Sequence, residues 1–76
     1  MQKHTLTAYI EFDPDTQLFV GTIPALPGAH TQGATLDELR HNLQEVVEVC
    51  LEERREQGEE LELTPFIGIQ QISVSV

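Results

Sequence analysis

A block rich in proline and glycine, followed at once by a helix start, constrains this 76-residue chain more than any other feature. Residues 23–33 read IPALPGAHTQG. Proline lacks the N–H that a β-ladder needs, whereas glycine allows positive φ and close approach of two backbones. Thr35 and Glu38 then have the spacing of a capping box, in which each side chain bonds the other residue's N–H. The block therefore predicts a tight connection between a strand and a long helix.

The residues before this block alternate between apolar and polar, which predicts a β-hairpin. In the first strand, over 4–12, one face carries Leu6, Ala8, Ile10 and Phe12. Asp13, Pro14 and Asp15 are turn formers. Residues 17–23 then give a second strand that is apolar on both faces, and 28–32 can add a short third one.

Residues 36–57 have the three-and-four spacing of one amphipathic helix. The apolar stripe consists of Leu36, Leu39, Leu43, Val46, Val47 and Cys50. Gly58 stands where a left-handed residue commonly ends a helix, and Arg54 and Arg55 suit the negative end of the helix dipole. We therefore expect a single long helix, with Cys50 as a buried, unreactive thiol.

Residues 65–76 predict a final strand whose apolar phase changes at Gln70 and Gln71. Ile67 and Ile69 share one face, and the other face carries Ile72, Val74 and Val76. Such a change indicates a β-bulge or a strand covered on both faces. The predicted α+β fold is β-β-β-α-β: an antiparallel meander, the last strand parallel to the first through a right-handed crossover, and one helix packed on one face.

Size and charge limit the function. The 76 residues predict one domain, residues 1–76, with a formal net charge of −9 and one cysteine. A core this small rarely contributes more than about 3–5 kcal/mol, so we expect oligomerisation to add stability. The negative charge disfavours direct binding of nucleic acid and favours basic proteins or further copies as partners. With no signal-peptide pattern and no apolar run of about 20 residues, we expect a cytoplasmic protein without membrane contact.

No grouping of residues predicts catalysis or a cofactor. Glu11 lies opposite the apolar face of the first strand, and Asp13 and Asp15 serve a turn, so the converging carboxylates of a two-metal nuclease are missing. His4 and His30 have no serine or acid beside them, and a small hydrolase is therefore disfavoured. We expect His30 to be an exposed loop residue with local hydrogen bonds.

His41, Glu45, Glu48 and Glu52 recur on one side of the predicted helix. Three interpretations fit this pattern. The side chains form a solvated face, they form a strip that binds a basic partner, or His41 and Glu45 are two ligands of a metal site. A metal ion needs three or four ligands, so we predict no metal site. The sequence does not separate the first two interpretations.

The central block and the strands around it resemble the N-terminal domain of the HicB antitoxins. The similar residues are 19–28 (FVGTIPALPG), 31–38 (TQGATLDE), Asn42, Glu45 and 66–68 (FIG). The resemblance covers nearly the whole chain and implies a truncated RNase H-like fold. It also implies an antitoxin that binds a small RNA-cleaving toxin, HicA. Full-length members usually carry a separate C-terminal DNA-binding domain, for which 76 residues leave no room, so we expect no DNA binding by this protein.

The leading hypothesis is thus a HicB-like antitoxin of a type II toxin–antitoxin system, which covers the RNA-binding surface of a basic toxin. The candidate partner-binding residues are Leu26, Pro27, Glu45, Glu48 and Glu52. The alternative is a stand-alone oligomeric assembly or regulatory module without a toxin. We expect a homo-oligomer, a dimer or tetramer, with Ile72, Val74 and Val76 as candidate interface residues.

Overall fold

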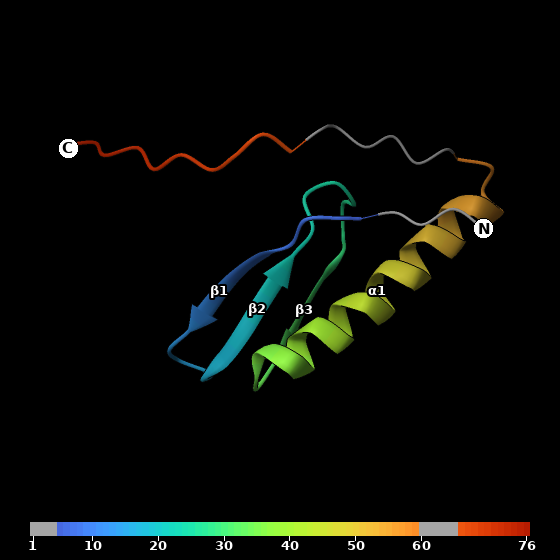
Figure 1. The fold of residues 1–76 in the computed structure, drawn as a ribbon, viewed down its shortest axis with the longest axis horizontal. Helices are drawn as coiled ribbons and strands as arrows, with labels where there is room; N and C mark the ends of the chain where they lie inside the picture. Colours follow the sequence, from blue (N-terminus) through green and yellow to red (C-terminus); the bar gives the residue numbers. More distant parts are fainter. Residues whose placement is uncertain (1–4, 60–65) are drawn as a thin grey trace.

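The computed structural model describes residues 5–59 and 66–76, and it contains three strands followed by one helix (Figure 1). The elements are β1 (Tyr9–Asp13), β2 (Leu18–Thr22), β3 (His30–Gly33) and α1 (Leu36–Glu56). The sheet is antiparallel in the order β1-β2-β3, so β2 is central, as its two apolar faces predicted. The predicted α+β class, with a three-stranded meander and then a helix on one face, is confirmed.

The turn between β1 and β2 is held by the residues predicted to form it. Asp13 pairs with Leu18 across the hairpin. The Asp13 carboxylate accepts from the Asp15 N–H at 3.0 Å, and its carbonyl accepts from the Gln17 N–H at 2.8 Å. Gln17 has a positive φ of 62°, and its side-chain amide donates to the Pro14 carbonyl at 2.8 Å. The hairpin thus places a non-glycine residue in the left-handed region.

The central block folds into a closed loop between β2 and β3. The Ile23 N–H donates to the Ala29 carbonyl at 2.9 Å, the Leu26 N–H to the Ile23 carbonyl at 3.1 Å, and the Ala29 N–H to the Leu26 carbonyl at 2.9 Å. Gly28, with φ of 90°, completes the turn. The buried core consists of Ile23, Leu26, Ala29, Leu39 and Leu43. Three of its five members therefore come from this loop.

Two glycines allow α1 to lie close against the sheet. A Cβ at Gly33 would lie 2.6 Å from the backbone nitrogen of Leu39, and one at Gly21 would lie 2.9 Å from Leu43 Cδ1. Because the obstacle at Gly33 is backbone, it cannot rotate away. The Asn42 side-chain amide also donates to the Gln32 carbonyl at 2.8 Å and fastens α1 to β3. The helix is therefore seated on the β3 side of the sheet.

Both ends of α1 carry the predicted caps. The Glu38 N–H donates to Thr35 Oγ1 at 3.1 Å, which is one of the two bonds of a capping box. At the other end Gly58 has φ of 74°, and the N–H groups of Gly58 and Glu59 donate to the Arg55 and Arg54 carbonyls at 3.1 and 2.9 Å. This is a Schellman motif, in which a left-handed residue ends the helix. The helix stops at Glu56, one residue before the predicted end.

The predicted fourth strand is not formed, which corrects the expectation for the end of the chain. Residues 66–76 extend away from the body and pair with no strand of the described residues (Figure 1). Phe66 packs edge-on against Tyr9 with ring centroids 6.3 Å apart, whereas Ile67 is 93% exposed. Alternating apolar residues indicate which side chains would share a face if the segment formed a strand. A strand also requires partners for its backbone N–H and C=O groups.

Candidate functional site

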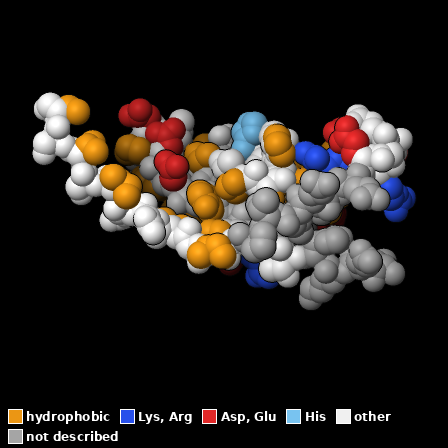
Figure 2. All heavy atoms as spheres, turned by 90° about the horizontal axis from the view of Figure 1, so that it is seen from above, with side chains coloured by type: hydrophobic (Ala, Val, Ile, Leu, Met, Phe, Trp, Pro, Cys, Tyr) orange, Lys and Arg blue, Asp and Glu red, His pale blue; other side chains and the backbone are white. Residues whose placement is uncertain are grey.

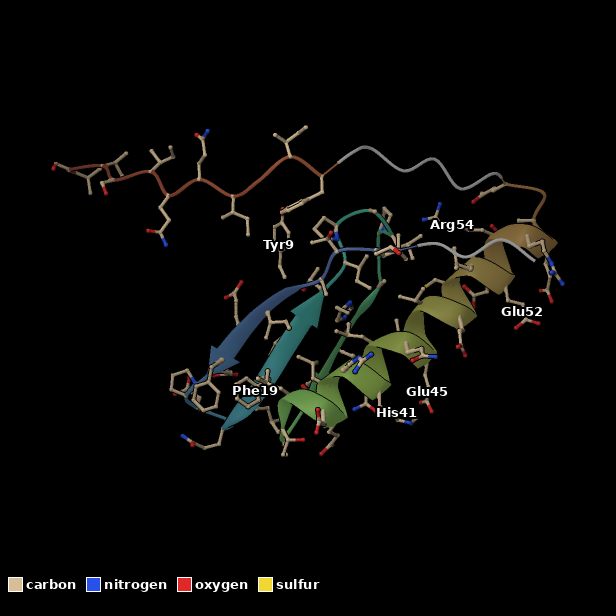
Figure 3. The ribbon with its side chains drawn as sticks, viewed as in Figure 1. Tyr9, Phe19, His41, Glu45, Glu52 and Arg54 are labelled. Carbon is tan, nitrogen blue, oxygen red and sulfur yellow. The ribbon has the colours of Figure 1, made fainter. Side chains whose placement is uncertain are left out.

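The side of α1 that faces away from the sheet carries a row of acidic side chains. We call Glu45, Glu48 and Glu52 the acidic strip; all three are exposed. Residues three and four apart lie on the same side of a helix, so the three carboxylates are neighbours. Figure 3 shows Glu45 and Glu52 on this outer side with His41, whereas Arg54 lies on the other side of the helix. The strip therefore presents concentrated negative charge to solvent.

Two weak contacts hold the side chains of the strip. His41 Nε2 lies 3.1 Å from Glu45 Oε1, and the two side chains are 72% and 64% exposed. The Gln44 amide donates to Glu48 Oε1 at 3.3 Å. Exposed pairs of this kind contribute about 0–1 kcal/mol, so a partner can replace them at little cost. Across residues 5–59 and 66–76, no three His, Cys, Asp or Glu side chains are grouped as metal ligands.

The structure corrects the assignment of Leu26 to partner binding. Leu26 is fully buried, because the loop of residues 23–29 closes around its side chain. Pro27, next to it, is exposed and remains a candidate for partner contact. The spacing of the prolines predicted a loop correctly, but it did not say which side chain the loop encloses.

An open apolar groove lies between the β1 side of the sheet and α1. Its volume is about 600 Å³, and its apolar lining is Leu6, Ala8, Ile10, Ile23, Leu36, Leu43 and Val47. Asp37 and Arg40 add charges to the helix side. The groove exists because the backbone of α1 lies close to β3 and β2 but, in the described part of the chain, does not approach β1. Ile10 and Phe12, which lie on the apolar face that the sequence predicted for this strand, are consequently 51% and 49% exposed.

The other candidate residues lie apart from the strip and the groove. His30 is exposed at the start of β3, and its Nδ1 lies 3.1 Å from the Gly28 carbonyl, which is the local hydrogen bond predicted for it. Cys50 is half-buried against the core rather than fully buried. Glu11 is exposed on β1, and His4 lies outside the described residues.

The candidate interface residues at the end of the chain all face solvent. Ile72 is 75% exposed and Val74 is 78% exposed, and Val76 is fully exposed. Figure 2 shows apolar side chains along the segment that projects at the left of the molecule. Within the described residues, no helix combines the length and the apolar character that crossing a bilayer requires.

Comparisons with known proteins give the family of this chain. Residues 2–61 match the family described as UPF0150-like. A UPF0150 protein of Thermotoga maritima is 46% identical over 72 residues, covering 95% of this chain and 92% of the relative. Others from Synechocystis and Archaeoglobus fulgidus are 44% and 42% identical, covering 97% and 86% of this chain and 100% and 87% of the relatives. No solved structure matches. The chain therefore belongs to the UPF0150 family.

Proposed function

We propose that this protein is a HicB-like antitoxin of a type II toxin–antitoxin system, which binds and neutralises a small basic RNA-cleaving toxin in the cytoplasm. The observation that carries the proposal is the acidic strip, whose three carboxylates are exposed on one side of α1. An enzyme that cleaves RNA needs a basic surface, because its substrate is a polyanion. The resemblance of residues 19–38 to HicB supports the same conclusion.

Neutralisation follows from charge and shape together. Glu45, Glu48 and Glu52 offer the toxin carboxylates in place of RNA phosphates, and the body of the bound protein excludes the RNA. Exposed charges act over a Debye length of about 8 Å at physiological salt, so the strip mainly accelerates the encounter. Pro27, on the exposed side of the central loop, adds a rigid apolar contact. This function needs neither catalysis nor a cofactor from the chain, and we propose none.

The test measures binding to the basic protein encoded by a neighbouring reading frame. Replacing Glu45 and Glu48 by Gln should slow association several-fold at low salt and change dissociation little. Glu11→Gln is the matched control, because it removes one exposed carboxylate from β1, away from the strip. High salt should abolish the difference between the variants. Failure of the wild-type protein to bind the toxin or to inhibit its RNA cleavage would refute the proposal.

A second candidate function is a stand-alone oligomeric assembly or regulatory module without a toxin. The exposed apolar segment of residues 66–76 favours it, because contact with another chain would remove this apolar surface from water. The two functions differ in one measurable property. Glutamine at Glu45, Glu48 and Glu52 should slow the association of the antitoxin with its toxin, whereas it should leave the oligomers of the assembly module unchanged.

We propose that the isolated protein neither cleaves nor binds nucleic acid. The net charge of −9 opposes phosphate contacts, which carry most non-specific affinity. Electrophoretic mobility shift with its own promoter DNA, at low salt, should give no specific complex at micromolar protein. A metal-supplemented nuclease assay should likewise show no cleavage that depends on Glu11.

A further inference from the structure

The last described segment of the chain has the composition of a strand and lacks a strand partner. Residues 66–76 read FIGIQQISVSV and contain no charged residue. Ile72, Val74 and Val76 alternate with Ser73 and Ser75, so an extended backbone places the three apolar side chains on one face and the two hydroxyls on the other. All five residues are exposed. The segment thus has one apolar face and one polar face, as an edge strand of a sheet does.

The free edge of β1 likewise lacks a strand partner among the described residues. β1 pairs with β2 on one side, and its other side pairs with no described strand. An unpaired edge offers a row of N–H and C=O groups to another chain. Beside this edge the groove between β1 and α1 is open, and Ile10 is half-exposed. A strand added to β1 would turn alternate side chains toward that groove and form its missing wall.

The contact of Phe66 with Tyr9 indicates which copy supplies the strand. Successive residues of a strand point to opposite faces, so Tyr9 lies on the face opposite Ile10 and the groove. Phe66 therefore holds the base of the segment on the face away from the groove. From there residues 67–76 lead away from the molecule (Figure 1). In this arrangement the apolar face of the segment is available to a second molecule.

We propose that two copies of this chain exchange these segments reciprocally. Residues 72–76 of each copy add to the free β1 edge of the other, and Ile72, Val74 and Val76 close the groove against Ile10. The interface uses the same surfaces on both copies, as a two-fold dimer requires. Burial of the apolar side chains favours it, and the absence of charged side chains in the segment avoids the desolvation cost of burying them. The dimer needs no toxin and so goes beyond the proposed function.

The first experiment measures the mass of the full-length protein in solution. The wild type should sediment as a dimer at tens of micromolar, twice the chain mass of 8.5 kDa. Val74→Asp should weaken dimerisation at least tenfold, whereas Ser73→Asp, with the same charge on the opposite face, should leave it nearly unchanged. Circular dichroism checks that both variants keep their fold. A wild-type monomer, or a dimer that tolerates Val74→Asp, would overturn the proposal.

The second experiment identifies which chains are joined. In a Cys50→Ala background, Ile10→Cys and Val74→Cys proteins are mixed and treated with a short bis-maleimide. We expect a link between positions 10 and 74 of different copies, identified by mass spectrometry. A protein carrying both cysteines should form the same link as a cross-linked dimer. If that protein links within one chain and the mixture does not react, the segment pairs with its own β1 and the exchange is refuted.

Discussion

The β3 side of this molecule is closed by its own chain, whereas the β1 side is left open. On the β3 side, Gly33 lets the backbone of α1 approach the sheet, Asn42 bonds the Gln32 carbonyl, and Leu39 is fully buried. On the β1 side the backbone of α1 does not approach the described strand, and Phe12 packs against Phe19 with the two rings inclined at 61° and their centroids 5.2 Å apart. The difference shows that one helix and a short loop complete only part of a small core.

This asymmetry separates stability from binding. The apolar residues that seat α1 and close the loop of residues 23–29 are buried, so their substitution should destabilise the protein. The groove, the β1 edge and the acidic strip are exposed, so substitution there should change association and leave the fold intact.

The largest effect is expected from Leu39→Ala, at the centre of the closed side. Truncation of a buried leucine costs about 2–5 kcal/mol, which approaches the whole stability expected of a core this small. Leu36→Ala is the control, since Leu36 lines the open groove and is 56% exposed. It should change the free energy of unfolding by no more than about 0.5 kcal/mol. Urea denaturation of both variants measures the difference, and equal losses would mean that the two sides share the stability.

Gly33→Ala tests how closely the helix must lie on β3. A Cβ there would lie 2.6 Å from the Leu39 nitrogen, so the helix must shift, and overpacking of this kind costs about 1–3 kcal/mol. Gly68→Ala is the matched change on the projecting segment, where an added Cβ meets nothing within 4 Å. Thermal unfolding should therefore show a clear loss of melting temperature for Gly33→Ala alone. An unchanged Gly33→Ala protein would show that α1 can slide toward β1.

The helix and the hairpin turn could largely be predicted from the sequence because local chemistry sets where they begin and end. Thr35 and Gly58 mark the two ends of α1, and Asp13 marks the hairpin turn; in each case a short-range hydrogen bond or a positive φ fixes the structure. The spacing of Leu39 and Leu43 likewise identified the buried face of the helix. These signals lie within a few residues of the structure they determine.

The closure of the central loop and the position of α1 could not be predicted, because they depend on contacts that form only when the segments fold together. Whether Leu26 points inward depends on how the loop closes between Ile23 and Ala29. The position of α1 across the sheet depends on Gly21 and Gly33, whose effect is visible only after the strands are paired. The sequence also shows the alternation of apolar and polar residues in 72–76. It describes the faces of a strand and does not identify the edge with which the strand pairs.

A smaller effect is expected at Gln17, the strained residue of the hairpin turn. Its φ of 62° lies in the left-handed region, which costs a non-glycine residue about 1–2 kcal/mol. Comparing Gln17→Gly with Gln17→Ala isolates the free-energy cost of the positive φ, because both variants lose the side-chain bond to the Pro14 carbonyl. The glycine variant should be more stable than the alanine variant by about 1 kcal/mol in urea denaturation. The reverse order would indicate that the turn changes conformation when the side-chain bond is lost.

The smallest effect on stability is expected from the acidic strip, although it should have the largest effect on association with a basic partner. Glu45→Gln removes the charge that faces His41 at 3.1 Å, and Glu48→Gln weakens a 3.3 Å bond from Gln44. Because these side chains are exposed, the free energy of unfolding should change by no more than about 0.5 kcal/mol. Urea denaturation of the double variant at low and high salt checks this. Unchanged stability combined with slow association at low salt would assign the strip to partner capture, whereas a stability loss above 1 kcal/mol would place the strip among the structural parts of the closed side.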